Sequence, residues 1–108
     1  MSSPIATTPE PPYYAVIFTS RTGKHTRGYS EMAQRMIELA SVAPGYLGIE
    51  SVRENEEIGI TVSYWRDEES IKSWKANAQH QVAQETGRAR WYEEYCVRVA
   101  LVERVYGS

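Results

Sequence analysis

Two tryptophans and a histidine stand close together in residues 63–80, a stretch that is otherwise mostly charged and polar. Trp74 follows Trp65 by nine positions, and His80 follows Trp74 by six. A histidine with its ordinary pKa of about 6.5 is largely neutral at pH 7 and can accept a proton from a phenol-like group. The stretch therefore indicates either plain core packing around the tryptophans or a ligand pocket in which His80 is the base.

Further residues could complete such a pocket, because small-molecule sites combine apolar walls with a few convergent polar groups. Asn77 lies between Trp74 and His80, and these three are the catalytic candidates. For each candidate, packing or a solvated surface position stays open as the alternative. The candidates for substrate binding are Trp65, Tyr64, Tyr92 and Arg90.

The spacing of Trp74 and His80 restricts this hypothesis. Six residues at about 100° each would turn His80 about 120° away from Trp74 in a regular helix. A shared pocket therefore requires a break between them. We expect the break at residues 76–78, because the asparagine at position 77 often leaves the helical path.

Composition excludes several classes of function. The chain has 108 residues, which fits one domain, with 42% hydrophobic residues and a net charge of -2. A slightly negative net charge favours neither nucleic acid nor an anionic membrane as partner. No apolar run approaches the roughly 18 residues of a membrane-spanning helix. The single cysteine, Cys96, cannot form an internal disulfide, and no Cys/His cluster has metal-ligand spacing. We expect a cytoplasmic protein without a bound metal, with Cys96 buried as a small hydrophobe.

The elements that would position these residues follow from pattern. Residues 1–12 hold four of the five prolines and predict a disordered tail, so that one folded domain spans 13–108. The basic loop 21–27 is either a solvated loop or a pocket mouth that attracts an anionic ligand. Strands are predicted at 13–20, 46–54, 58–65 and 90–106, and helices at 29–43 and 68–77 with a further helical piece at 78–86.

This β-α-β-β-α-β order predicts an α+β fold of the ferredoxin-like, split βαβ type, with an antiparallel four-stranded sheet and its helices on one face. The strands are partly apolar on both faces, so the face without helices would be an apolar patch larger than a monomer usually exposes. We therefore predict a homodimer that buries more than about 2,000 Å² between two sheets.

Residues 59–84, residues 91–106 and the hairpin entry "PGYLGIES" at 44–51 resemble the antibiotic biosynthesis monooxygenase superfamily. The resemblance runs from about Tyr13 to Tyr106. It implies a dimeric α+β barrel, formed when two ferredoxin-like sheets join, and a pocket between each sheet and its helices.

The resemblance leaves three functions open. Quinone-forming members oxidise phenol-like aromatic molecules with dioxygen and without a cofactor. Haem-degrading members use a first-strand asparagine, where this chain has residues such as Ile17, and a histidine about ten positions after the helix tryptophan, whereas His80 follows by six. The third possibility is a non-catalytic dimer that binds a small ligand.

Overall fold

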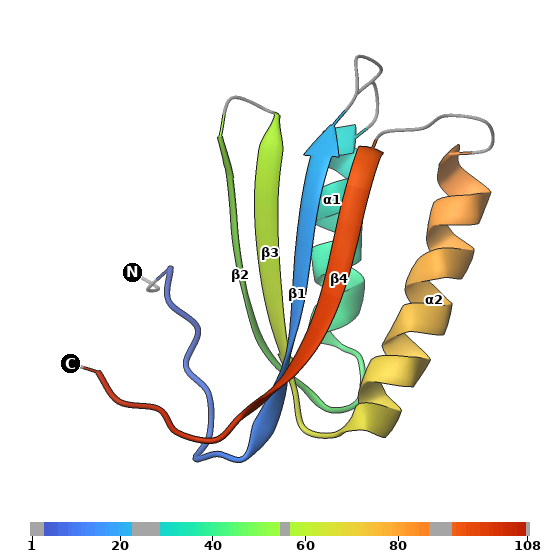
Figure 1. Cartoon of the computed structure of the whole chain (residues 1–108). Helices are drawn as coiled ribbons and strands as arrows, with labels where there is room; N and C mark the ends of the chain where they lie inside the picture. The colour runs from blue at the N-terminus through green and yellow to red at the C-terminus, as the bar shows by residue number, and fades with distance from the viewer. Residues whose placement is uncertain (1–3, 23–28, 55–56, 87–91, 108) are drawn as a thin grey trace.

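The computed structural model of the chain describes residues 4–22, 29–54, 57–86 and 92–107, and the side chains of all of these except 29–30, 80–86 and 92–93. The order of elements is the predicted one (Figure 1). The elements are β1 (Tyr13–Thr22), α1 (Tyr29–Ser41), β2 (Tyr46–Glu54), β3 (Ile58–Trp65), α2 (Glu68–Thr86) and β4 (Tyr92–Val102).

The four strands form one antiparallel sheet in the order β2-β3-β1-β4. Both helices lie on one side of it, and the N- and C-terminal segments extend on the other side (Figure 1). This arrangement confirms the predicted ferredoxin-like α+β fold.

The sheet has two distinct faces because successive side chains of a strand point to opposite sides. On β3, Trp65 points toward the helices, and its neighbour Tyr64 points away from them. Tyr14 on β1 lies opposite Trp65, and Ala15 lies opposite Tyr64, so that the alternation continues across the sheet. We call these two sides the helix face and the open face.

Helix α2 begins at a side-chain cap. The Asp67 carboxylate accepts the backbone N–H of Ser70 at 2.8 Å, and Glu68 and Glu69 occupy the first turn, where the helix dipole favours negative charge. From there α2 runs without interruption to Thr86, so the break predicted at residues 76–78 is wrong. The alanines on both sides of Asn77 are the strongest helix formers, and they outweigh the weak preference of one asparagine for a turn.

The core centres on Trp65, which has 0% exposure. Tyr46 meets its ring edge-on and Trp74 stacks on it, each with ring centroids 5.8 Å away. The indole N–H donates to the hydroxyl of the buried Ser63 at 2.8 Å, so the one polar group of the ring has a partner. Burial raises the pKa of the Tyr46 hydroxyl above its ordinary value.

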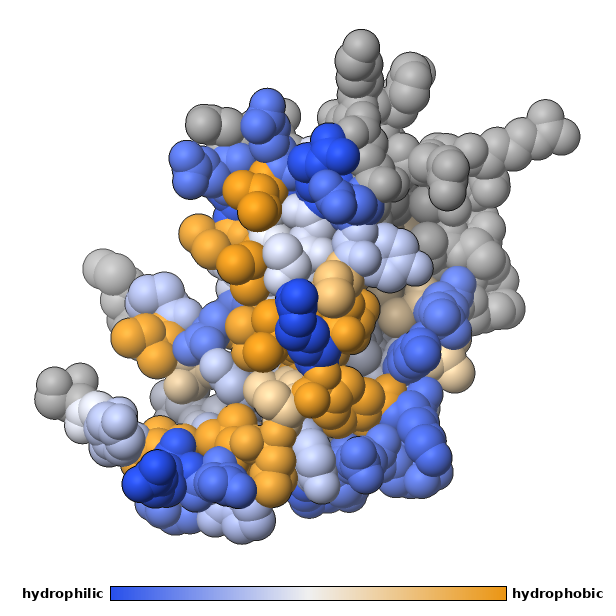
Figure 2. Space-filling model, viewed as in Figure 1, coloured by the Kyte–Doolittle hydropathy of each residue, from blue (hydrophilic) through white to orange (hydrophobic). Residues whose placement is uncertain are grey.

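The helices do not cover the sheet evenly. The side chains of Val97, Val99 and Leu101 on β4 belong to the helix face, yet they are 49–50% exposed. Figure 2 shows apolar side chains gathered at the centre of the view, where β4 runs along the edge of the sheet. Cys96, on the open face of the same strand, is exposed in the single chain, so its predicted burial is wrong there. No helix within the described residues is long and apolar enough to cross a membrane.

Candidate active site between the two helices

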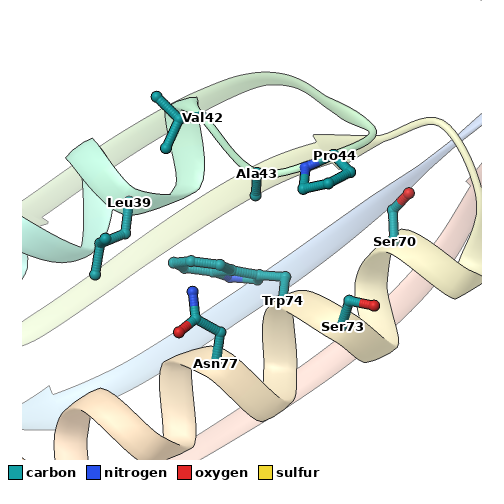
Figure 3. A pocket seen from close by; sticks show the side chains of 8 residues that line it. All are labelled: Leu39, Val42, Ala43, Pro44, Ser70, Ser73, Trp74 and Asn77. Atoms are coloured by element: carbon teal, nitrogen blue, oxygen red, sulfur yellow. The ribbon is translucent and has the colours of Figure 1, made fainter.

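A cavity of about 340 Å³ lies between the end of α1 and the first half of α2 (Figure 3). Its α2 side comes from positions i, i+3, i+4 and i+7 of one helix face. Trp74 extends from that face toward α1, and Ala43 points toward its indole (Figure 3). The residues lining the cavity are Leu39, Val42, Ala43, Pro44, Ser70, Ser73, Trp74 and Asn77.

Trp74 has a double role in this geometry. One face of its indole stacks on Trp65 with an angle of 24° between the planes, and the side chain also borders the cavity. Trp74 is only partly buried, in contrast to the fully buried Trp65. The two tryptophans that the sequence singled out are therefore in contact, but only Trp74 can meet a ligand in this cavity.

Asn77 is the polar side chain best placed beside the indole. Figure 3 shows its amide directed toward Trp74, whereas the hydroxyls of Ser70 and Ser73 point away from the ring. Ser70 is also engaged, because its hydroxyl donates to Asp67 at 2.7 Å. An amide can donate to and accept from a ligand, so Asn77 could hold a hydroxyl or carbonyl oxygen over the edge of Trp74.

The turn between α1 and β2 closes one end of the cavity because it is held against α2. Gly45 has a φ of +83°, which favours glycine, and its backbone lies against the Ser70 side chain where a Cβ would collide with the Ser70 hydroxyl. The Gly45 carbonyl accepts the N–H of Arg66 at 2.8 Å. The hydroxyl and backbone N–H of Ser70 both donate to Asp67 and hold the pKa of that carboxyl below its ordinary value.

Tyr64 does not border this cavity. It lies on the open face, on the opposite side of the sheet from the Trp65–Trp74 stack. Its hydroxyl donates to Glu50 at 2.6 Å, and Tyr13 meets its ring edge-on at 5.8 Å. Burial, followed by the hydrogen bond and charge of Glu50, raises the pKa of Tyr64 from 10.0 to about 12.

Three other candidates fall wholly or partly outside the described residues. His80 belongs to the continuous helix α2, and Tyr92 opens β4, but their side chains are not among those described. Arg90 and residues 23–28, which form most of the basic loop, lie outside the described ranges altogether. Because α2 has no break between them, the position of His80 is turned about 120° from that of Trp74, and the condition for a pocket shared by the two residues is not met.

The described lining contains no residue that commonly ligates iron in a haem protein, that is, no His, Cys, Met or Tyr. Across the described ranges there is also no group of three or more His, Cys, Asp or Glu side chains that could hold a metal ion.

Sequence patterns alone missed half of the cavity. Its α1 side, Leu39 together with residues 42–44, reaches Trp74 only through the tertiary packing of the turn. Ser70 could have been found from the sequence, because it precedes Trp74 by four positions and so lies on the same helix face, and Ser73 follows Ser70 by three.

Several known proteins are similar to this chain. The uncharacterized protein YqjZ of Bacillus subtilis (strain 168) is 54% identical over 100 residues, which covers 93% of this chain and 88% of YqjZ. A variant of SnoaB, a cofactor-independent oxygenase from Streptomyces nogalater, superposes with a TM-score of 0.71 at 8% identity, covering 89% of this chain and 98% of SnoaB. A variant of MhuD with two manganese protoporphyrin IX molecules per active site gives a TM-score of 0.66 at 16% identity, covering 88% and 99% of the two chains.

The two solved structures share the fold of this chain at an identity too low to transfer an activity. The sequence evidence goes further, because the model of the antibiotic biosynthesis monooxygenase family matches residues 12–86. That match includes α1, α2 and every residue lining the cavity. The chain belongs to the antibiotic biosynthesis monooxygenase family.

Proposed function

We propose that the chain is a cofactor-independent monooxygenase that oxidises a small, phenol-like aromatic molecule with dioxygen in the cavity beside Trp74. The observation that carries the proposal is the pairing of an aromatic wall with one inward-directed amide, Asn77, in a cavity of about 340 Å³. Small-molecule sites span roughly 300–1,000 Å³, so this cavity suits a compact ligand of a few fused rings.

Each residue has a defined task in this proposal. Trp74 stacks on the flat substrate, Asn77 holds its phenol oxygen, and the half-buried Leu39 supplies apolar contact on the α1 side. Because α2 is continuous, the position of His80 is turned about 120° from that of Trp74, so His80 is not assigned as the base and the phenol proton leaves to solvent. The phenolate itself then reduces dioxygen. Counted from the keto tautomer of the substrate, a ring CH₂ group becomes a carbonyl with one oxygen atom of O₂, and its two hydrogens leave with the other oxygen atom as water, so the balance needs no external reductant.

The test uses anthrone, whose enol is a three-ring phenol, and measures both dioxygen consumption and anthraquinone formation. We expect the protein to accelerate both in equal amounts, and Trp74→Ala to lose the acceleration while remaining folded. Binding of anthrone without dioxygen consumption would instead identify a non-catalytic binding protein. Inert anthrone together with a haem absorption shift that His80→Ala abolishes would identify a haem protein.

We also propose that the chain works as a homodimer in the cytoplasm. The open face supports the first part, because Val52, Ile58 and Ile60 expose 71%, 50% and 41% of their surface there. An exposed free thiol at Cys96 suits a reducing compartment. Sedimentation of the purified protein at micromolar concentration tests the assembly, and a monomeric mass would refute it.

A further inference from the structure

Residues 4–12 lie against the open face of the sheet, and we call them the N-terminal strap. The backbone N–H of Ala6 donates to one carboxylate oxygen of Glu50 at 3.0 Å, and the other oxygen accepts the Tyr64 hydroxyl at 2.6 Å. The Thr8 and Tyr13 hydroxyls share a hydrogen bond of 2.7 Å. Both Glu50 oxygens are thus used, one by the strap and one by the sheet.

Gly48 on β2 makes room for the strap. A Cβ at this position would lie 2.9 Å from the Ala6 Cβ, closer than such atoms approach, and only 3.9 Å from the Thr8 methyl group. The backbone of Gly48 is not in the left-handed region, but the pairing of β2 with β3 shifts register between Tyr46 and Gly48, and glycine is common at such a bulge. The register shift and the close approach of Ala6 both favour glycine here, and only the approach of Ala6 concerns the strap.

The strap covers only one end of the open face. Beneath it, Tyr13 is 4% exposed, whereas Val52, Ile58 and Ile60 further along the same face remain open. Ile5 on the strap is 70% exposed, so the strap adds apolar surface of its own. The uncovered side chains need an occupant that meets both the sheet and the strap.

Four residues at the same level of the open face, one from each strand, indicate what kind of partner fits this face. Glu50, Val62, Ile17 and Arg98 lie side by side across the four strands, with the acid at one edge and the base at the other. Of the two-fold axes that can stack two such sheets, one across the strands would oppose like charges, whereas one along the strands would place Glu50 opposite Arg98 of the partner subunit, with the apolar pair between them. Symmetric dimers require such a self-complementary surface, so a second copy of this chain fits this face.

We infer that the N-terminal strap is part of the interface through which two copies of this chain associate, with Gly48 as its docking position. The inference rests on the homodimer of the proposed function. The strap residues 4–11 precede the residues 12–86 that the family model matches, whereas Gly48 and Glu50 lie within them.

A size exchange at the docking position tests the inference. Gly48→Ala puts a methyl group against Ala6 and displaces the strap, and Ala6→Gly in the same chain restores the space. We expect Gly48→Ala to raise the dimer dissociation constant by about tenfold or more, and the double variant to return it close to that of Ala6→Gly alone. Sedimentation velocity over a dilution series measures all four proteins, with circular dichroism as the folding control.

A chain that lacks residues 2–11 gives a second measurement if Gly48→Ala does not fold. It should also dissociate at about tenfold higher concentration than the full chain. A wild-type dissociation constant in either Gly48→Ala or the shortened chain would overturn the inference, and so would a monomeric wild-type protein. Anthrone oxidation takes place on the other side of the sheet, so an intact, strap-dependent dimer without oxygenase activity would refute the proposed reaction and leave the strap inference standing.

Discussion

Trp74 stacks on Trp65 across the boundary between α2 and the sheet, with ring centroids 5.8 Å apart and planes inclined by 24°. The pair connects the core to the cavity, because the buried ring of Trp65 fixes the position of the Trp74 ring that borders the cavity. A ligand on Trp74 would therefore meet a surface that the core already holds in place, which reduces the entropy that binding must overcome.

Replacement of Trp65 and of Trp74 should lower the free energy of unfolding by different amounts. Trp65→Ala removes a fully buried ring, and we expect the free energy of unfolding to fall by about 3–5 kcal/mol. Trp74→Ala should cost clearly less, because part of its ring is exposed, yet it should abolish anthrone binding. Urea denaturation and calorimetric titration measure the two effects. Equal losses of stability would show that Trp74 is plain core.

Gly45 should be the least replaceable glycine among those described. In Gly45→Ala, a residue with a Cβ must adopt the left-handed backbone conformation, which costs about 1–2 kcal/mol. The new Cβ would also collide with the Ser70 side chain. Unfolding by urea should show a loss of at least that size. Gly107→Ala is the matched control, because a Cβ there meets open space, and its stability should equal that of the wild type.

The order of elements could be predicted from the sequence because each segment carries a local signal. Residues 58–65 alternate as a half-buried strand, and Asp67 stands where a helix cap belongs. Local reasoning failed at Asn77, where a single turn-favouring residue inside a long helix yields to its alanine neighbours and to the anchoring of Trp74.

Only the α2 side of the candidate site could be predicted from the sequence. Helical spacing places Asn77 beside Trp74, but it does not show that Leu39 and the turn at 42–44 face them, because that contact depends on how α1 ends. The strap was missed for a related reason. Its prolines predict a disordered tail, and Ala6 contacts Gly48 and Glu50, more than 40 positions away along the chain.

The hydroxyl of Tyr64 should titrate near pH 12, above its ordinary value of 10.0. Since the folded pKa lies above the unfolded one, the group stabilises the protein fully below pH 10, and this contribution is lost as the pH rises through about 12. NMR of ring-labelled tyrosine can follow the titration, and Tyr64→Phe assigns the signal.

Glu50→Gln should lower the pKa of Tyr64 toward 10.0 without reaching it, because burial makes the largest contribution to the shift and remains. Glu54→Gln, a neighbouring carboxylate on the same strand and face, should leave the titration unchanged. A normal pKa of Tyr64 in the wild-type protein would contradict the Tyr64–Glu50 hydrogen bond.

Filling the cavity with a side chain tests most directly whether the substrate is oxidised beside Trp74. Ala43 points toward the indole of Trp74 and lies on the turn, away from the aromatic stack, so Ala43→Phe should occupy the space of the ligand without disturbing the core (Figure 3). Ser41→Phe adds the same ring at an exposed position that does not line the cavity. The measurement is kcat/KM for anthrone oxidation. We expect kcat/KM to fall by at least about tenfold in Ala43→Phe and to stay unchanged in Ser41→Phe. Wild-type kcat/KM in a folded Ala43→Phe protein would show that the reaction takes place elsewhere.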